Sequence, residues 1–193
     1  MYQLKENQKY YTTSMLKDLG YSHYKINQMV INHLLKRINR TTYENLMYTG
    51  QEDDYINAAA YVPNGVICLM SAARYYDLTN FLPDAVDIAI HRKSKVSTLP
   101  KWPQLKIYYF DQKRMDLGVT LVSVGSDSFQ IFDIEKTVVD IIYYRNKLGI
   151  EETSEVLQNY LKRPNVKITQ LYNYAKQLRC ESILRTYLEV LIS

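Results

Sequence analysis

Hydrophobic residues recur at helical spacing twice within the first fifty positions. Residues 12–19 have an apolar face and end at Gly20, and Ser22 can cap a second helix. The second helix has apolar positions at i, i+3, i+4, i+7 and i+8, which predicts one buried side made of Ile26, Met29, Val30, His33 and Leu34. Two short strand candidates, residues 35–39 and 43–48, follow around a basic turn. This order is typical of a winged helix-turn-helix.

The opposite side of the second predicted helix is polar and carries no acid. Gln and Asn side chains pair best with adenine edges in the major groove, and Lys can also reach base edges. The residues predicted to face bases are His23, Tyr24, Lys25, Gln28 and Asn32. Those predicted to hold phosphates or form the wing contact are Thr13, Ser22, Arg37 and Arg40. An amphipathic surface helix without a DNA role would also have a polar face, so that interpretation stays open.

Ile31 does not fit the polar face, because it falls on the outer side of the helix. Contact with a thymine methyl group and packing against a neighbouring segment are both open at this point.

The rest of the chain predicts a small β-containing middle followed by helices. An acidic run at Gln51–Tyr55 is a plausible boundary, which gives a DNA-binding domain at 1–50 and a second domain at 51–193. The predicted strands are 86–90, 106–110, 119–124 and 129–132. The predicted helices are 66–76, 133–148 capped by Asp133, 151–162, one opening at Thr169, and a last one that includes Leu191. The fold class is therefore α+β: a winged helix-turn-helix, a mixed α/β middle and a helical C-terminal region.

The positive charge is concentrated in two stretches. Residues 1–50 contain seven basic and three acidic side chains, whereas the formal net charge of the whole chain is +4. Residues 91–114 contain seven basic side chains against Asp111 alone. The residues considered for a second DNA contact are Arg92, Lys93, Lys95, Lys101, Lys113 and Arg114. A solvated loop is the alternative interpretation of this stretch.

Composition excludes several classes of protein. A hydrophobic content of 47% is too high for a disordered chain, and no run approaches the roughly 20 apolar residues of a membrane span. The polar residues 1–11 lack the apolar stretch of a signal peptide, so a cytoplasmic location is expected. Cys68 and Cys180 lie inside apolar segments and are expected to be buried thiols.

Catalytic and metal-binding motifs give no support for an enzyme. His23, His33 and His91 lack metal-ligand spacing, and His33 is expected in the core, so no metal or cofactor is expected. Gly125-Ser126 followed by Asp133 and Glu135 is similar to a nucleotidyltransferase motif. That chemistry needs a helix between the two elements, and six residues leave no room for one. Asp133 is better explained as a helix cap.

An ordered set of segments resembles the AbiEi family of antitoxins. The set begins with YVPNGVICLMSAARYYDLT at 61–79 and FDIEKTVVD at 132–140. It continues with YRNKLG at 144–149, LQNYLK at 157–162, YAK at 174–176 and YLEVL at 187–191. The family's wing usually carries an Arg-Gly pair before its Tyr, whereas this chain has Arg40-Thr41-Thr42-Tyr43 without the glycine.

The resemblance implies an antitoxin of a type IV toxin–antitoxin system, linked to abortive infection as a defence against phage. Its winged helix would bind inverted repeats in double-stranded DNA upstream of its own operon, two copies per operator, and repress transcription. Its C-terminal part would counteract a nucleotidyltransferase-like toxin without a stable complex. The alternative is a winged-helix transcriptional regulator with a ligand- or partner-binding domain and no antitoxin role. No membrane partner is expected.

Overall fold

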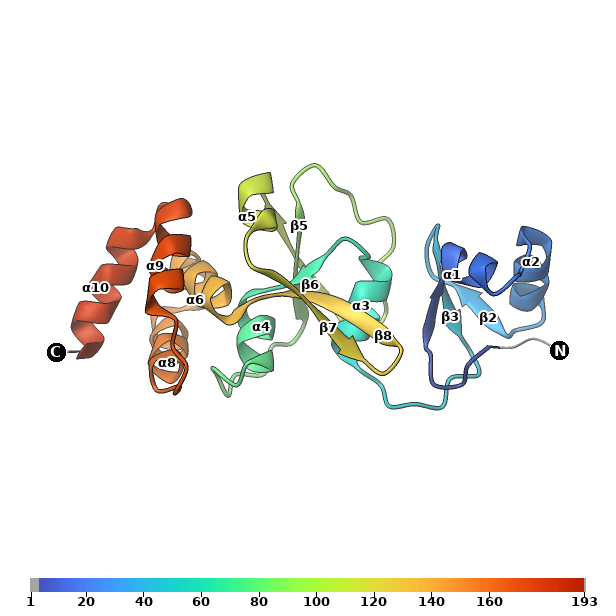
Figure 1. Cartoon of the computed structure of the whole chain (residues 1–193), viewed down its shortest axis with the longest axis horizontal. Helices are drawn as coiled ribbons and strands as arrows, with labels where there is room; N and C mark the ends of the chain where they lie inside the picture. The colour runs from blue at the N-terminus through green and yellow to red at the C-terminus, as the bar shows by residue number, and fades with distance from the viewer. Residues whose placement is uncertain (1–3, 193) are drawn as a thin grey trace. The chain divides into compact units, whose positions relative to one another are not determined.

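The computed structural model describes residues 4–192 and confirms the α+β class, with ten helices and two sheets within that range (Figure 1). The chain divides into two compact units. The N-terminal unit comprises the residues up to Asn64 together with Lys95–Gln104 and Leu121–Phe129. The C-terminal unit comprises Gly65–Ser94, Leu105–Thr120 and Gln130–Ser193.

The N-terminal unit contains a three-stranded antiparallel sheet in the order β1-β3-β2. Its strands are β1 (Tyr10–Thr12), β2 (Leu35–Arg37) and β3 (Thr42–Asn45). Its helices are α1 (Thr13–Asp18), α2 (His23–Ile31) and α3 (Asp54–Tyr61). The sheet and the first two helices share one core, formed by the buried side chains Tyr11, Leu16, Ile26, Met29, Leu35 and Tyr43.

Both short helices α1 and α2 end in the same way, with one residue in the left-handed region. Gly20 follows α1 with φ +83°, and His33 follows α2 with φ +55°. In the second case the N–H of Leu34 donates to the carbonyl of Met29 at 2.9 Å, and the N–H of His33 donates to Val30 at 3.2 Å. This pair of hydrogen bonds satisfies the last carbonyls of a helix.

This ending corrects one prediction. His33 was expected on the buried stripe of the second helix, but α2 ends at Ile31 and His33 is exposed. Because glycine usually occupies such a position, the sequence offered no sign that the helix stops there.

The second sheet has five strands in the order β6-β5-β4-β8-β7. Its strands are β4 (Val66–Ile67), β5 (Val86–His91), β6 (Leu105–Phe110), β7 (Val119–Val124) and β8 (Asp127–Phe132). β5 is a buried strand and pairs in parallel with β6 over all six of its residues. Four of its six residues are apolar and five are buried, as is typical of a strand covered on both faces.

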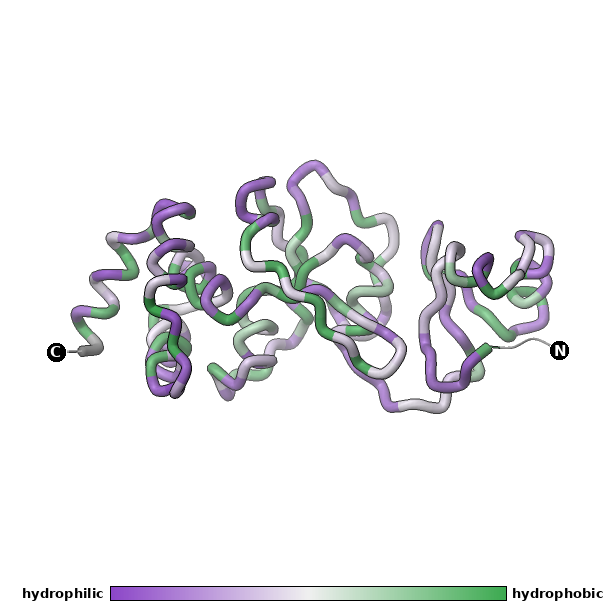
Figure 2. Tube along the Cα trace, viewed as in Figure 1, coloured by the Kyte–Doolittle hydropathy of each residue, from purple (hydrophilic) through white to green (hydrophobic). Residues whose placement is uncertain are grey.

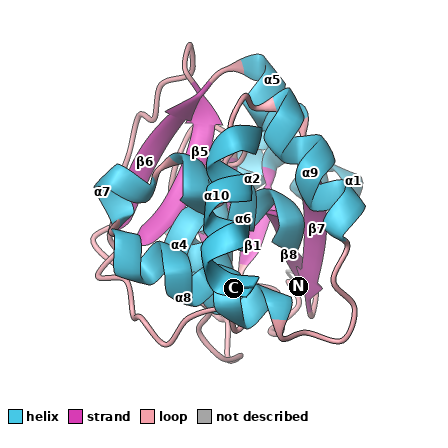
Figure 3. Cartoon of the chain, turned by 90° about the vertical axis from the view of Figure 1, so that its left-hand side faces the viewer, coloured by secondary structure: helices cyan, strands magenta, loops and turns pink. Residues whose placement is uncertain are grey.

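Helices make up most of the C-terminal unit (Figure 3). They are α4 (Leu69–Tyr75), α5 (Gln112–Asp116), α6 (Ile134–Tyr143), α7 (Arg145–Leu148), α8 (Ile150–Leu161), α9 (Ile168–Gln177) and α10 (Glu181–Ile192). Figure 2 shows apolar and polar positions alternating along α8 to α10, as expected of helices with one buried side. α6 is buried over most of its length and begins after Asp133, whose side chain accepts the N–H of Lys136 at 2.8 Å.

Several local features differ from the predictions. β1, α3 and α5 were not predicted, and Val66–Ile67 is a strand rather than the start of a helix. The helix predicted over 133–148 is interrupted at Tyr144, which separates α6 from α7. The side chain of Leu191 lies outside the described residues.

The two cysteines are free and buried, as predicted. Within residues 4–192, no helix is long and apolar enough to cross a membrane.

Candidate nucleic-acid interface

α2 is fixed to the N-terminal unit by one side only. Ile26 and Met29 are almost fully buried, and the Ser22 hydroxyl caps the helix by accepting the N–H of Lys25 at 3.3 Å. The four-residue connection from α1 contains Gly20 in the left-handed region, which allows the tight change of direction. The opposite side of α2 is therefore presented to solvent in a fixed register.

That solvent side has a specific chemistry. Tyr24 is 72% exposed and Ile31 is 64% exposed. Lys25, Asn27 and Asn32 are also exposed, and Gln28 is half-buried. Among residues 23–32 there is no carboxylate and no arginine. We call the residues Tyr24, Lys25, Asn27, Gln28, Ile31 and Asn32 the α2 face.

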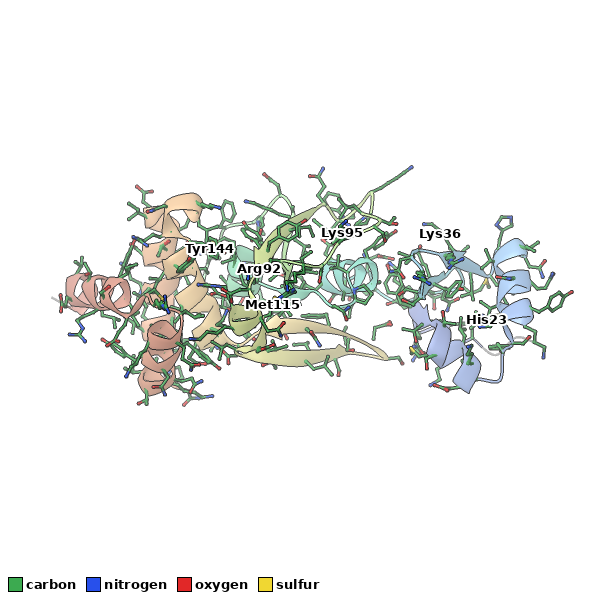
Figure 4. All side chains as sticks on the ribbon, turned by 90° about the horizontal axis from the view of Figure 1, so that it is seen from above. His23, Lys36, Arg92, Lys95, Met115 and Tyr144 are labelled. Carbon is green, nitrogen blue, oxygen red and sulfur yellow. The ribbon has the colours of Figure 1, made fainter. Side chains whose placement is uncertain are left out.

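The predicted base-facing residues thus lie on one helix and its C-terminal cap. His23, the first residue of α2, is exposed as well, beside the N-terminal cap (Figure 4). Asn27 was not among the predicted residues, and two interpretations of Ile31 were open. Helical spacing could have placed both residues on this side of α2, since Asn27 and Ile31 are four residues apart and Tyr24 and Ile31 are seven apart.

The turn between β2 and β3 is held by a side chain instead of a glycine. The Asn39 carboxamide oxygen accepts the N–H of Thr41 at 3.0 Å and the N–H of Thr42 at 2.9 Å. Its amide nitrogen donates to the carbonyl of Ala60 at 2.9 Å. No residue of this described turn has a positive φ, so the geometry does not require glycine.

The four residues predicted to hold phosphates have different roles in this structure. The Thr13 hydroxyl donates to the carbonyl of Thr41 at 3.2 Å. The Arg37 guanidinium donates to the carbonyls of Asn39 and Arg40 at 3.1 and 3.2 Å. Both side chains therefore stabilise the β2–β3 turn. Arg40 is exposed, and the exposed Ser22 hydroxyl accepts the N–H of Lys25 but keeps its own O–H to donate, so these two are the simpler candidates for a phosphate contact.

Two basic side chains of the N-terminal unit are paired with acids. Lys36, which is labelled in Figure 4, donates to Glu44 across the β2–β3 pair at 3.1 Å, and this hydrogen bond raises the pKa of Lys36. Lys9 is buried and forms an ion pair with Glu52, which lowers the pKa of that carboxyl. The basic character that remains exposed includes Lys17, Lys25 and Arg40.

The structure separates the six residues considered for a second DNA contact. Lys95 and Lys101 belong to the N-terminal unit, whereas Arg92, Lys93 and Lys113 belong to the C-terminal unit, and these five are exposed (Arg92 and Lys95 are labelled in Figure 4).

Arg114 must be withdrawn from this set. It is 6% exposed, pairs with Asp140, and lies with its guanidinium 3.9 Å from the ring centre of Tyr143. A side chain enclosed in this way is not available to a phosphate.

Asp133 and Glu135 both have structural partners. Asp133 caps α6 and accepts the hydroxyl of Tyr174 at 2.7 Å. Glu135 is buried and accepts the hydroxyl of Tyr160 at 3.2 Å. In the described part of the chain, no group of three or more His, Cys, Asp or Glu side chains could hold a metal ion.

Comparison with known proteins gives little further information. No family model matches the chain, and no curated protein matches it. Among solved structures, the chain is similar to the crystal structure of the RV2827C protein from Mycobacterium tuberculosis, with a TM-score of 0.43 and 11% sequence identity over 94% of this chain and 76% of that chain. A likeness of this size carries no conclusion about fold or function.

Proposed function

We propose that this chain is a sequence-specific DNA-binding repressor and an antitoxin, and that its N-terminal elements are a winged helix-turn-helix. The observation that carries the DNA-binding part is the α2 face: an exposed helix side with Lys, Asn and Gln and without any carboxylate. The element order supports it, because α1 and α2 are joined by four residues and the β2–β3 hairpin follows directly.

In this proposal α2 enters the major groove. Gln28, Asn32 and Asn27 offer amide groups that match the donor and acceptor pair of adenine. Arg40 and Ser22 hold backbone phosphates, which set orientation without reading sequence. One short helix reads few base pairs, so two copies bind an inverted repeat in the chain's own promoter.

The antitoxin part rests on the resemblance of the ordered segments from residue 61 onward to AbiEi antitoxins. The C-terminal unit would counteract a nucleotidyltransferase-like toxin encoded by the adjacent gene, without a stable complex. The transferase activity would belong to the toxin, which is consistent with the structural partners of Asp133 and Glu135 described above.

The test of DNA binding is a double substitution on the α2 face. Lys25→Ala with Gln28→Ala is expected to weaken binding to the inverted repeat by roughly ten-fold or more at fixed salt, since one good base contact contributes about 1–3 kcal/mol. The matched control is Lys147→Ala with Gln158→Ala, which removes the same two side-chain types from exposed helix positions of the C-terminal unit. Equal affinity of the α2 variant and the control would refute the proposed interface.

Co-expression with the adjacent gene product separates the two parts of the proposal. The full-length Lys25→Ala, Gln28→Ala variant is expected to rescue growth, because the antitoxin role is placed in the other unit. Specific DNA binding by the wild type without growth rescue would instead identify a winged-helix regulator that is not an antitoxin.

A further inference from the structure

The α2 face contains an exposed branched apolar side chain among amides. Ile31 lies one helical turn from both Asn27 and Gln28 and two turns from Tyr24. It is 64% exposed although the same helix buries Ile26 and Met29 almost completely. The segments of its own unit therefore leave the Ile31 side chain largely uncovered.

A single exposed apolar residue is ordinary on a protein surface. The neighbours of Ile31 make this one informative. Asn and Gln amides match adenine N6 and N7 in the major groove, and an apolar side chain matches the C5 methyl group of thymine. Adenine and thymine form one base pair. A helix side on which amides lie next to a branched apolar side chain can therefore contact both bases of an A·T pair.

The same face lacks the group that reads guanine best. Guanine O6 and N7 are read by arginine or lysine, and residues 23–32 contain no arginine and one lysine, Lys25. Against the one lysine of this segment, the α2 face has the amide side chains of Asn27, Gln28 and Asn32. The chemistry of the face is thus directed toward A·T pairs.

We propose that Ile31 contacts the C5 methyl group of a thymine in each half-site, so that α2 reads an A·T step by combining this contact with the amides of Asn27 and Gln28. This inference rests on the proposed function, since it assigns the DNA bases that the same face recognises. It makes Ile31 a specificity-determining residue.

The test uses the full chain and the inverted repeat upstream of its own gene. Each thymine of one half-site is replaced in turn by deoxyuridine, which removes the methyl group and keeps the base-pairing atoms. For the wild type, one or two positions are expected to lose about four-fold in affinity, the effect of one buried methyl-sized group. The Ile31→Ala variant is expected to bind the thymine and uracil duplexes equally at those positions.

The control is Ile150→Ala, which removes an isoleucine of nearly identical exposure, 65%, from the start of α8 in the C-terminal unit. It is expected to keep the full thymine preference. A second variant, Ile31→Val, retains branched methyl groups and is expected to retain part of the preference.

The outcomes separate the inference from the proposed function. If the wild type binds the inverted repeat specifically and Ile31→Ala keeps the same thymine preference, the inference is overturned and the DNA-binding proposal stands. If the wild type does not prefer the inverted repeat over unrelated DNA, both are overturned. If Ile31→Ala changes self-association in sedimentation and leaves the thymine preference intact, Ile31 belongs to a protein contact and the inference is overturned.

Discussion

At the scale of single residues, Asn39 explains how this chain forms its hairpin turn without glycine. One side chain satisfies the amides of Thr41 and Thr42 and also reaches the carbonyl of Ala60. An Asn side chain can replace a backbone turn in this way because its length matches one peptide unit. Asn39 therefore fixes the position of Arg40, the residue proposed to meet phosphate.

Replacing Asn39 by Ala is expected to lower the free energy of unfolding by about 1–2 kcal/mol, because two backbone amides lose their acceptor and one carbonyl loses its donor. Hydrogen exchange at the amides of Thr41 and Thr42 should become faster than in the wild type. Asn39→Ser is expected to fall between the two, since a hydroxyl accepts the same bonds more weakly. Unchanged exchange in the Ala variant would contradict this role.

At the scale of elements, the sequence was informative where a helix begins and less informative where it ends. Ser22 and Asp133 were predicted as caps, and both accept the backbone N–H three residues ahead. The end of α2 was missed because His33 takes the left-handed conformation that Gly20 takes after α1, and residues other than glycine adopt that conformation only rarely. Local sequence does not reveal such an ending.

β1 and α5 were missed for a related reason. Both are short, and strand β1 is defined by pairing with β3, which is thirty residues away in sequence. Three residues give too little alternation to predict a strand. The α2 face was largely predicted because helical periodicity depends on local spacing alone, whereas the burial of Arg114 depends on contacts with α6, which is distant in sequence.

The contact of Arg114 in α5 with α6 forms part of a buried cluster of charged side chains. Arg114 from α5 and Lys136 from α6 both pair with Asp140, and Lys136 and Asp140 are fully buried. Burial lowers the pKa of Lys136 despite its pairing with Asp140. One carboxylate therefore pairs with two basic side chains in the core of the C-terminal unit.

Asp140→Asn is expected to destabilise the protein by about 3–5 kcal/mol, because it leaves two buried basic groups without a counter-charge. Arg114→Met should cost less, since Lys136 and Asp140 then remain as a neutral pair. Urea unfolding followed by far-UV circular dichroism measures both, because α4 to α10 all belong to this unit. If Asp140→Asn and Arg114→Met lower the free energy of unfolding equally, the unpaired charge is not the main cause of the destabilisation.

At the scale of the whole molecule, the division into two units affects whether the cations of the basic stretch at 91–114 can be treated as one second DNA contact. The stretch crosses a unit boundary after Ser94, so its cations are divided between the two units. Lys95 and Lys101 share a unit with α2, and Arg92 and Lys93 do not. The pair Lys95 and Lys101 and the pair Arg92 and Lys93 carry the same charge and lie in the same stretch of sequence. A substitution of either pair is therefore a charge-matched control for a substitution of the other.

Neutralising Lys95 and Lys101 together is expected to reduce the log–log salt dependence of operator binding by about 0.9 for each phosphate that is no longer neutralised, or roughly two in all. If DNA phosphates are bound by the N-terminal unit alone, neutralising Arg92 and Lys93, which belong to the other unit, leaves the slope unchanged. Affinity for the inverted repeat is measured over a series of salt concentrations for the wild type and both double alanine variants. If the two variants flatten the slope equally, both units bind DNA phosphates; if neither does, the whole stretch is solvated and phosphate binding is confined to α2 and the β2–β3 turn.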